Sequence, residues 1–121
     1  MLAPNLVLYY VENVARSAAL YGELMGSAPI EQSEGFAMFK LASGMMLGFW
    51  AKATVAPPAA WQGAGGELCF AVADEALLQQ HFVALQAKGL TIAQEITEME
   101  FGRTFVALDP DGHRLRVYFP S

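Results

Sequence analysis

The chain has 121 residues, 55% of them hydrophobic and 16% charged, and its formal net charge is −5. This length suits one domain with a substantial core, and the composition excludes a disordered chain. The seven Lys and Arg residues are scattered along an acidic sequence, which excludes strong binding to the phosphates of nucleic acids.

The cysteine count and the hydropathy of the chain indicate the cellular compartment of the protein. One cysteine, Cys69, excludes a disulfide within the chain and suits a reducing compartment. No stretch approaches the roughly 18 consecutive apolar residues of a membrane helix, and the first residues lack the basic and apolar segments of a signal peptide. We therefore expect a cytoplasmic protein that does not associate with membranes.

The sequence divides into two similar units. The first covers residues 5–51 and the second residues 66–119. Residues 52–65 contain Pro57-Pro58, Trp61 and a cluster of glycines, and this composition predicts a linker.

The first unit opens with an apolar segment that predicts a strand over residues 6–11. Leu20, Tyr21 and Leu24 then recur at helical spacing, and Gly26 is placed to end the helix. Short apolar runs predict strands over residues 28–31, 36–41 and 45–51, the last two joined by a Ser-Gly turn.

The second unit repeats this order. A strand is predicted over residues 68–72, followed by a helix marked by Leu78, Phe82 and Leu85 and ended by Gly89. Strands are predicted over residues 91–95, 104–108 and 114–119, and the sequence Asp-Pro-Asp-Gly at 109–112 predicts a tight turn. The result is an α+β fold made of two βαβββ modules.

The end of the second unit carries a family resemblance. Residues 101–105 are Phe-Gly-Arg-Thr-Phe and residues 109–113 are Asp-Pro-Asp-Gly-His, which resembles the final hairpin of the vicinal oxygen chelate superfamily. That superfamily includes glyoxalases, bleomycin-resistance proteins and extradiol dioxygenases. Residues 10–17 resemble its first strand and the start of its first helix. The chain is most similar to small resistance-type members, including those that sequester phenazine antibiotics, and the resemblance implies a homodimer, domain-swapped so that modules from different chains complete each groove.

The resemblance also implies where a metal ion would be held. Superfamily enzymes use four inward side chains, one from the first and last strand of each module, and alternation along a strand separates groove-facing from helix-facing residues. The groove-facing residues are then Leu6, Leu8, Tyr10, Met46, Gly48, Trp50, Glu67, Cys69, Ala71, Arg114, Arg116 and Tyr118. The four ligand positions fall on Leu6, Gly48, Glu67 and Arg116. Because only Glu67 could bind a metal and Arg116 would repel one, we predict neither a metal site nor a cofactor.

Glu67 and Arg116 belong to strands that the fold makes neighbours. We predict that their side chains form a charge-assisted pair where superfamily enzymes hold the metal.

Other reactive residue types have ordinary interpretations. His81 and His113 fall outside the ligand positions, so we expect structural or surface roles. Cys69 has apolar neighbours and no histidine beside it, which predicts an inert thiol. The carboxylates of Glu95, Glu98 and Glu100 are expected around a solvated loop rather than in a catalytic pair.

The groove positions favour a ligand pocket. Trp50, Tyr10, Met46 and Tyr118 would form its walls, and an indole facing a cavity can stack on a planar ligand. Glu67 and Arg116 would supply polar contacts, while Phe101 would add a second aromatic wall and Arg103 a polar hook. Trp61 could cover the groove or only cap its outside.

Three functions fit these observations. The preferred one is metal-free binding, without catalysis, of a planar aromatic molecule, cationic or zwitterionic, as in antibiotic or toxin resistance. A metal-dependent glyoxalase-type lyase or dioxygenase would require a register shifted by one residue. A dimeric protein with a vestigial groove is the third.

Overall fold

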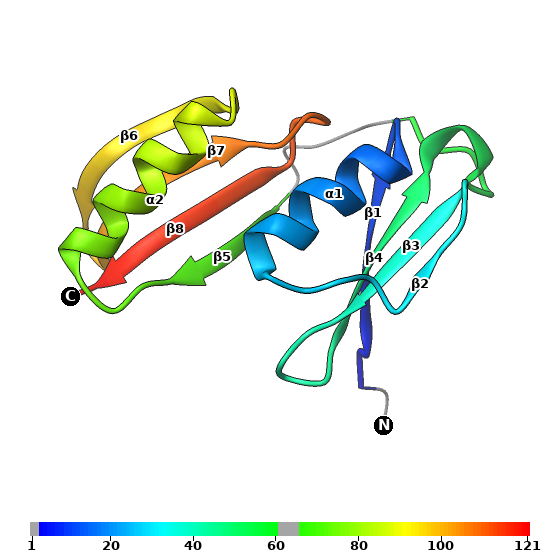
Figure 1. The fold of residues 1–121 in the computed structure, drawn as a ribbon, viewed down its shortest axis with the longest axis horizontal. Coiled ribbons are helices and arrows are strands. Elements are labelled where there is room, and N and C mark those ends of the chain that lie inside the picture. Colours follow the sequence, from blue (N-terminus) through cyan, green and yellow to red (C-terminus); the bar gives the residue numbers. More distant parts are fainter. Residues whose placement is uncertain (1–2, 61–65) are drawn as a thin grey trace. The chain divides into compact units, whose positions relative to one another are not determined.

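A computed structural model describes residues 3–60 and 66–121. The chain forms two compact units, Met1–Trp61 and Gln62–Ser121. Each unit is a βαβββ module with one helix and a mixed four-stranded sheet, so the predicted α+β fold is confirmed (Figure 1). Trp61, whose role in the linker we considered above, lies outside the described residues.

The first unit has the strand order β1-β4-β3-β2. Its elements are β1 (Leu6–Val11), α1 (Val14–Met25), β2 (Glu31–Gln32), β3 (Phe36–Lys40), β4 (Met46–Ala51) and the 3-10 helix η1 (Lys52–Thr54). β1 and β4 are parallel, whereas β3 pairs antiparallel with both β4 and β2. The crossover through α1 therefore brings the first and last strands of the unit side by side.

The second unit repeats this topology in the order β5-β8-β7-β6. Its elements are β5 (Glu67–Ala71), α2 (Glu75–Ala87), β6 (Thr91–Met99), β7 (Gly102–Leu108) and β8 (Arg114–Pro120). β5 and β8 are parallel, and β7 pairs antiparallel with β8 and β6. Of the helices in the described ranges, neither is long and apolar enough to cross a membrane.

The ends of both helices follow from local side-chain chemistry. The Asn13 side chain accepts a hydrogen bond from the Arg16 backbone N–H at 3.0 Å, and Asp74 accepts one from Leu77 at 2.8 Å. These are N-caps, worth about 1 kcal/mol each. α1 ends at Gly26, whose φ of 64° is the left-handed conformation that glycine tolerates best.

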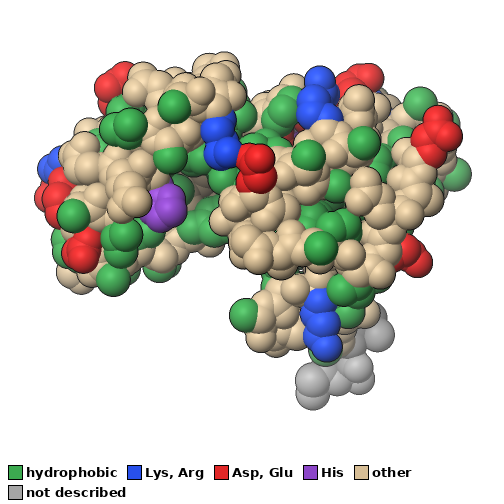
Figure 2. Space-filling view, viewed as in Figure 1, with side chains coloured by type: hydrophobic (Ala, Val, Ile, Leu, Met, Phe, Trp, Pro, Cys, Tyr) green, Lys and Arg blue, Asp and Glu red, His purple; other side chains and the backbone are tan. Residues whose placement is uncertain are grey.

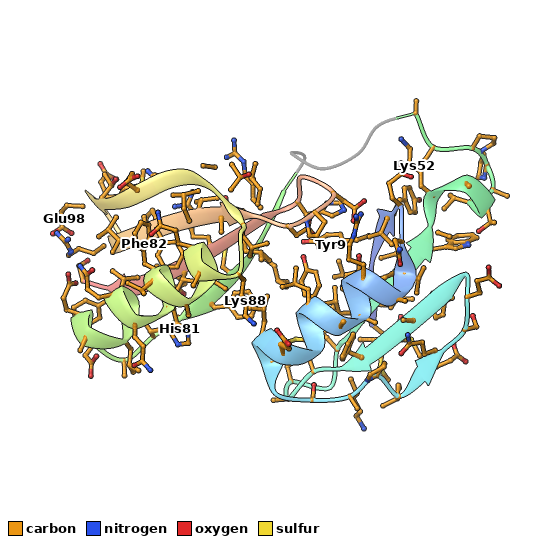
Figure 3. All side chains as sticks on the ribbon, turned by 45° about the horizontal axis from the view of Figure 1, so that its top comes forward. Tyr9, Lys52, His81, Phe82, Lys88 and Glu98 are labelled. Carbon is orange, nitrogen blue, oxygen red and sulfur yellow. The ribbon has the colours of Figure 1, made fainter. Side chains whose placement is uncertain are left out.

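Each helix packs on one face of its own sheet. In the first unit, the rings of Tyr21 on α1 and Phe49 on β4 are 4.6 Å apart, and both residues are fully buried. In the second unit, Phe82 of α2 meets Phe105 of β7 edge to face at 5.2 Å, while the neighbouring His81 is exposed (Figure 3). The opposite face of each sheet, which we call its open face, carries no helix from the described part of the same unit.

Most predicted strand ends lie within two residues of those in the structure, but two strands differ by more. β2 covers only Glu31–Gln32 instead of residues 28–31. β6 continues to Met99 instead of ending at residue 95, because irregular pairing with β7 extends the ladder to Gly102. Glu95 lies within the strand as predicted, but Glu98 also belongs to the strand, so the loop expected between Glu95 and Glu100 is shorter than predicted.

Candidate functional site

The open face of the first sheet is apolar and aromatic. The β1–β4 register places Leu6 beside Met46, Leu8 beside Gly48, and Tyr10 beside Trp50. The rings of Tyr10 and Trp50 meet edge to face at 6.3 Å. The structure thus brings together two predicted site residues of this unit, Tyr10 and Trp50, whereas Met46 lies on the same face four residues away, at the start of β4.

Gly48 shows how tightly this face is filled. A Cβ atom added there would lie 2.7 Å from Leu8 Cδ2, 3.4 Å from Phe36 Cζ and 3.5 Å from a methyl group of Leu6. Leu47 and Phe49, on either side of Gly48, are fully buried on the helix face, so the predicted alternation of β4 is confirmed.

The open face of the second sheet is polar, and its centre is Arg116. Arg116 Nε donates to Glu67 Oε1 at 2.6 Å, and Nη2 donates to Glu67 Oε2 at 3.3 Å. The two side chains are 14% and 28% exposed. The predicted pair is confirmed as a two-pronged, charge-assisted contact.

Two further side chains hold the guanidinium in place. Arg116 Nη1 donates to Gln94 Oε1 at 3.1 Å and to Thr104 Oγ1 at 3.2 Å. Thr104 is fully buried, and its hydroxyl donates to the Val117 carbonyl at 2.9 Å, which fixes the oxygen as an acceptor for Arg116. Sequence reasoning missed both residues. Strand alternation could have identified Thr104, because Thr104 pairs directly with Tyr118 and therefore lies on the same face of the sheet.

Aromatic rings flank this network. Phe101 and Tyr118 meet edge to face at 5.9 Å, and the Arg116 guanidinium carbon lies 5.6 Å from the centre of the Phe101 ring. Phe101 is 43% exposed, so much of its ring remains accessible. The structure therefore brings together four predicted site residues: Glu67, Phe101, Arg116 and Tyr118. The position of the Arg116 guanidinium over the Phe101 ring is that of a cation–π contact.

Arg103 is not part of this group. Its Nε lies 3.1 Å from Glu75 Oε1 in the first turn of α2. Arg103 also shares a face of β7 with Phe105, which packs on α2. The residue expected as a polar hook in the groove thus points to the helix side of the sheet.

The charges on the open face shift two pKa values in opposite directions. Hydrogen bonding to Arg116 lowers the pKa of Glu67 despite partial burial, which acts the other way. Burial, followed by the nearby Glu67 carboxylate, raises the pKa of Cys69. The Cys69 thiol lies 3.8 Å from Glu67 Oε1 and stays protonated at neutral pH, which is the wrong state for a nucleophile.

The residues at the metal-ligand positions do not fit a metal ion. Leu6 and Gly48 offer no donor atom, and Arg116 binds both carboxylate oxygens of Glu67. Within residues 3–60 and 66–121, no group of three His, Cys, Asp or Glu side chains could hold a metal. A metal-dependent step has no ligand set at these positions.

The family is decided by comparison with known sequences. Residues 3–117 match the family described as the Glyoxalase/Bleomycin resistance protein/Dioxygenase superfamily. The chain belongs to this superfamily. The phenazine antibiotic resistance protein EhpR of Enterobacter agglomerans is 28% identical over 118 residues, which is 96% of this chain and 91% of EhpR.

Solved structures agree with this fold. The protein ATC0852 from Agrobacterium tumefaciens, determined in solution by NMR, is 44% identical with a TM-score of 0.91, and the match covers 100% of this chain and 99% of that one. A glyoxalase-related enzyme from Fulvimarina pelagi is 20% identical with a TM-score of 0.85, covering 98% and 88% of the two chains. At that identity the second likeness concerns the fold alone.

Proposed function

We propose that this protein binds a planar aromatic small molecule without a metal and without transforming it, as in resistance by sequestration. The observation that carries the proposal is the Glu67–Arg116 pair. Glu67 is the one residue at the four expected ligand positions that could bind a metal, and Arg116 binds both of its carboxylate oxygens. The relationship to a phenazine antibiotic resistance protein supports the same class of function and suggests phenazine as the first probe.

Each open face would contribute a different kind of contact. Trp50, Tyr10 and Met46 of the first unit offer an apolar surface for stacking on a flat ring system, a contact worth about 0.5–1.5 kcal/mol beyond the area it buries. Tyr118 and the accessible ring of Phe101 offer further aromatic contacts in the second unit.

The polar contacts would come from Glu67 and Arg116, whose positions are fixed by their neighbours. A few fixed polar groups among apolar walls are typical of sites that bind small molecules. Arg103 is left out of the proposed set because its guanidinium lies beside Glu75 on the helix side.

A homodimer is part of the proposal. The family resemblance implies one, and the apolar open face of the first sheet, with Tyr10 37% exposed, supports it. Sedimentation equilibrium would test it, with a mass of twice 13.1 kDa expected and a monomer at micromolar concentration contradicting it.

The Trp50→Ala variant tests the ligand surface. We expect its affinity for phenazine, measured by calorimetry, to fall roughly tenfold or more because a stacking partner and its buried area are lost. Circular dichroism should show an unchanged fold.

The second tryptophan provides the matched control. Trp61→Phe should keep the wild-type affinity, and phenazine should quench the fluorescence of its remaining tryptophan, Trp50. Unchanged affinity in Trp50→Ala, or quenching that depends on Trp61 alone, would remove Trp50 from the site.

A further inference from the structure

The open face of the second sheet contains a hollow beside Arg116. Its volume is about 230 Å³, and it is lined by Ala93, Gln94, Val106, Arg114 and Arg116. The space suits one small functional group with the carbon atoms next to it. Two of the seven basic residues of the chain line this one hollow.

The charges around the hollow do not balance. The β5–β8 register pairs Glu67 with Arg114, so this single carboxylate lies near two arginines. Both of its oxygens are bound by Arg116. In the part of the chain that the structure describes, Arg114 forms no ion pair, and the hollow therefore has one positive charge in excess.

Gln94 supplies an oriented donor at the same place. Its Oε1 accepts from Arg116, which fixes the direction of the amide, and its Nε2 contacts the thioether sulfur of Met99 at 3.5 Å. A thioether is a weak acceptor, so this N–H group would gain by binding an anionic oxygen.

We infer that this hollow holds the carboxylate, or a similar singly charged oxyanion, of the bound ligand, so that the ligand is an aromatic organic anion. This rests on the proposed function and narrows it. The net charge of −5 attracts cations only at long range, and salt at 0.1 M screens that attraction beyond about 10 Å. The arginines, in contrast, would contact the anion of the ligand directly.

A matched pair of probes tests the inference. Phenazine-1-carboxylate and phenazine-1-carboxamide have the same ring system and differ in charge. We expect the wild-type protein to bind the carboxylate at least about fivefold more tightly, with the preference shrinking as salt is raised from 0.02 to about 0.5 M.

The Arg114→Gln variant should lose that preference, with affinity for the carboxylate falling roughly three- to tenfold and affinity for the carboxamide unchanged. Lys88→Gln is the control, because it removes the same charge just after α2, on the other side of this sheet (Figure 3). It should behave like the wild type. Equal wild-type affinity for both probes, or equal losses in the two variants, would overturn the inference.

A second readout separates this inference from the proposed function. Benzoate is titrated while the Nε–Hε resonance of Arg114, assigned by its loss in Arg114→Gln, is followed by NMR. If neither phenazine binds, the proposed function fails, and a saturable shift with benzoate would still place an anion in the hollow. No phenazine binding and no shift would overturn both.

Discussion

Arg116 resembles a bound metal ion in two respects. It is a cation beside Glu67, and its planar guanidinium organises Glu67, Gln94 and Thr104 through directed hydrogen bonds. A guanidinium cannot polarise a substrate as a Lewis acid or lower the pKa of a bound water as a divalent metal does. Under the proposed function, this network would support recognition of a ligand without the chemistry of a metal ion.

The lowered pKa of Glu67 predicts how this network responds to pH. A carboxyl group whose pKa is lower in the folded state stabilises the protein above its ordinary pKa, and this contribution is lost as pH falls through the lowered folded pKa. We expect the unfolding free energy of the wild type to fall in that acidic range relative to Glu67→Gln. A Glu67 carboxyl resonance that titrates by NMR at the ordinary pKa would contradict this prediction.

Gly102 explains why a glycine stands in the Phe-Gly-Arg-Thr-Phe segment at the start of β7. Its φ is 138°, and an added Cβ would collide with the Phe119 carbonyl oxygen and lie 2.9 Å from the Ser121 nitrogen. The first is a backbone atom of β8 and the second a backbone atom of the residue after it, and neither can move aside as a flexible side chain could. The glycine thus allows β7 and β8 to approach at the strand end that carries Phe101.

Gly102→Ala should therefore be strongly destabilising. We expect a loss of about 2–4 kcal/mol in urea unfolding, from unfavourable φ and the backbone clash together. Gly112→Ala is the control, because Gly112 has a φ of 85° but open space around its Cβ position, and should lose only about 1 kcal/mol. Equal losses of unfolding free energy in the two variants would show that the close approach of β7 and β8 does not contribute to the cost of Gly102→Ala.

The elements that sequence could predict are those with clear alternation or clear caps. β1 has the predicted bounds because apolar residues run between polar ones, and Gly26 ends α1 as expected. The Glu67–Arg116 pair also followed from strand alternation combined with the family resemblance. Arg103 falls just before the predicted strand of residues 104–108, but β7 begins at Gly102, so alternation puts Arg103 on the same face as Phe105.

Other features depend on information that is not local. β6 has two register shifts, and no sequence pattern indicates where a strand slips against its neighbour. Gln94 reaches Arg116 from this irregular part of the strand, so its role becomes visible only in three dimensions.

The two modules share one topology and have diverged in chemistry. The open face of the first carries leucines, methionines and aromatic residues, whereas that of the second carries a charged network and an arginine-lined hollow. Within each unit, on the side that Figure 2 draws, Lys and Arg side chains lie apart from one another rather than in a stripe. Duplication of a βαβββ unit thus provides two sheet faces that can specialise separately, one for apolar contact and one for polar recognition.

Binding of an aromatic ligand without a metal is most directly tested by titrating phenazine into protein stripped with EDTA, with EDTA kept in the buffer, and measuring the heat. We predict saturable binding of phenazine, with an affinity that does not change when the EDTA is removed and Ni²⁺, Zn²⁺, Mn²⁺ or Fe²⁺ is added instead. Binding that disappears in EDTA and returns with one of these ions would contradict a metal-free receptor and favour a metal-dependent enzyme.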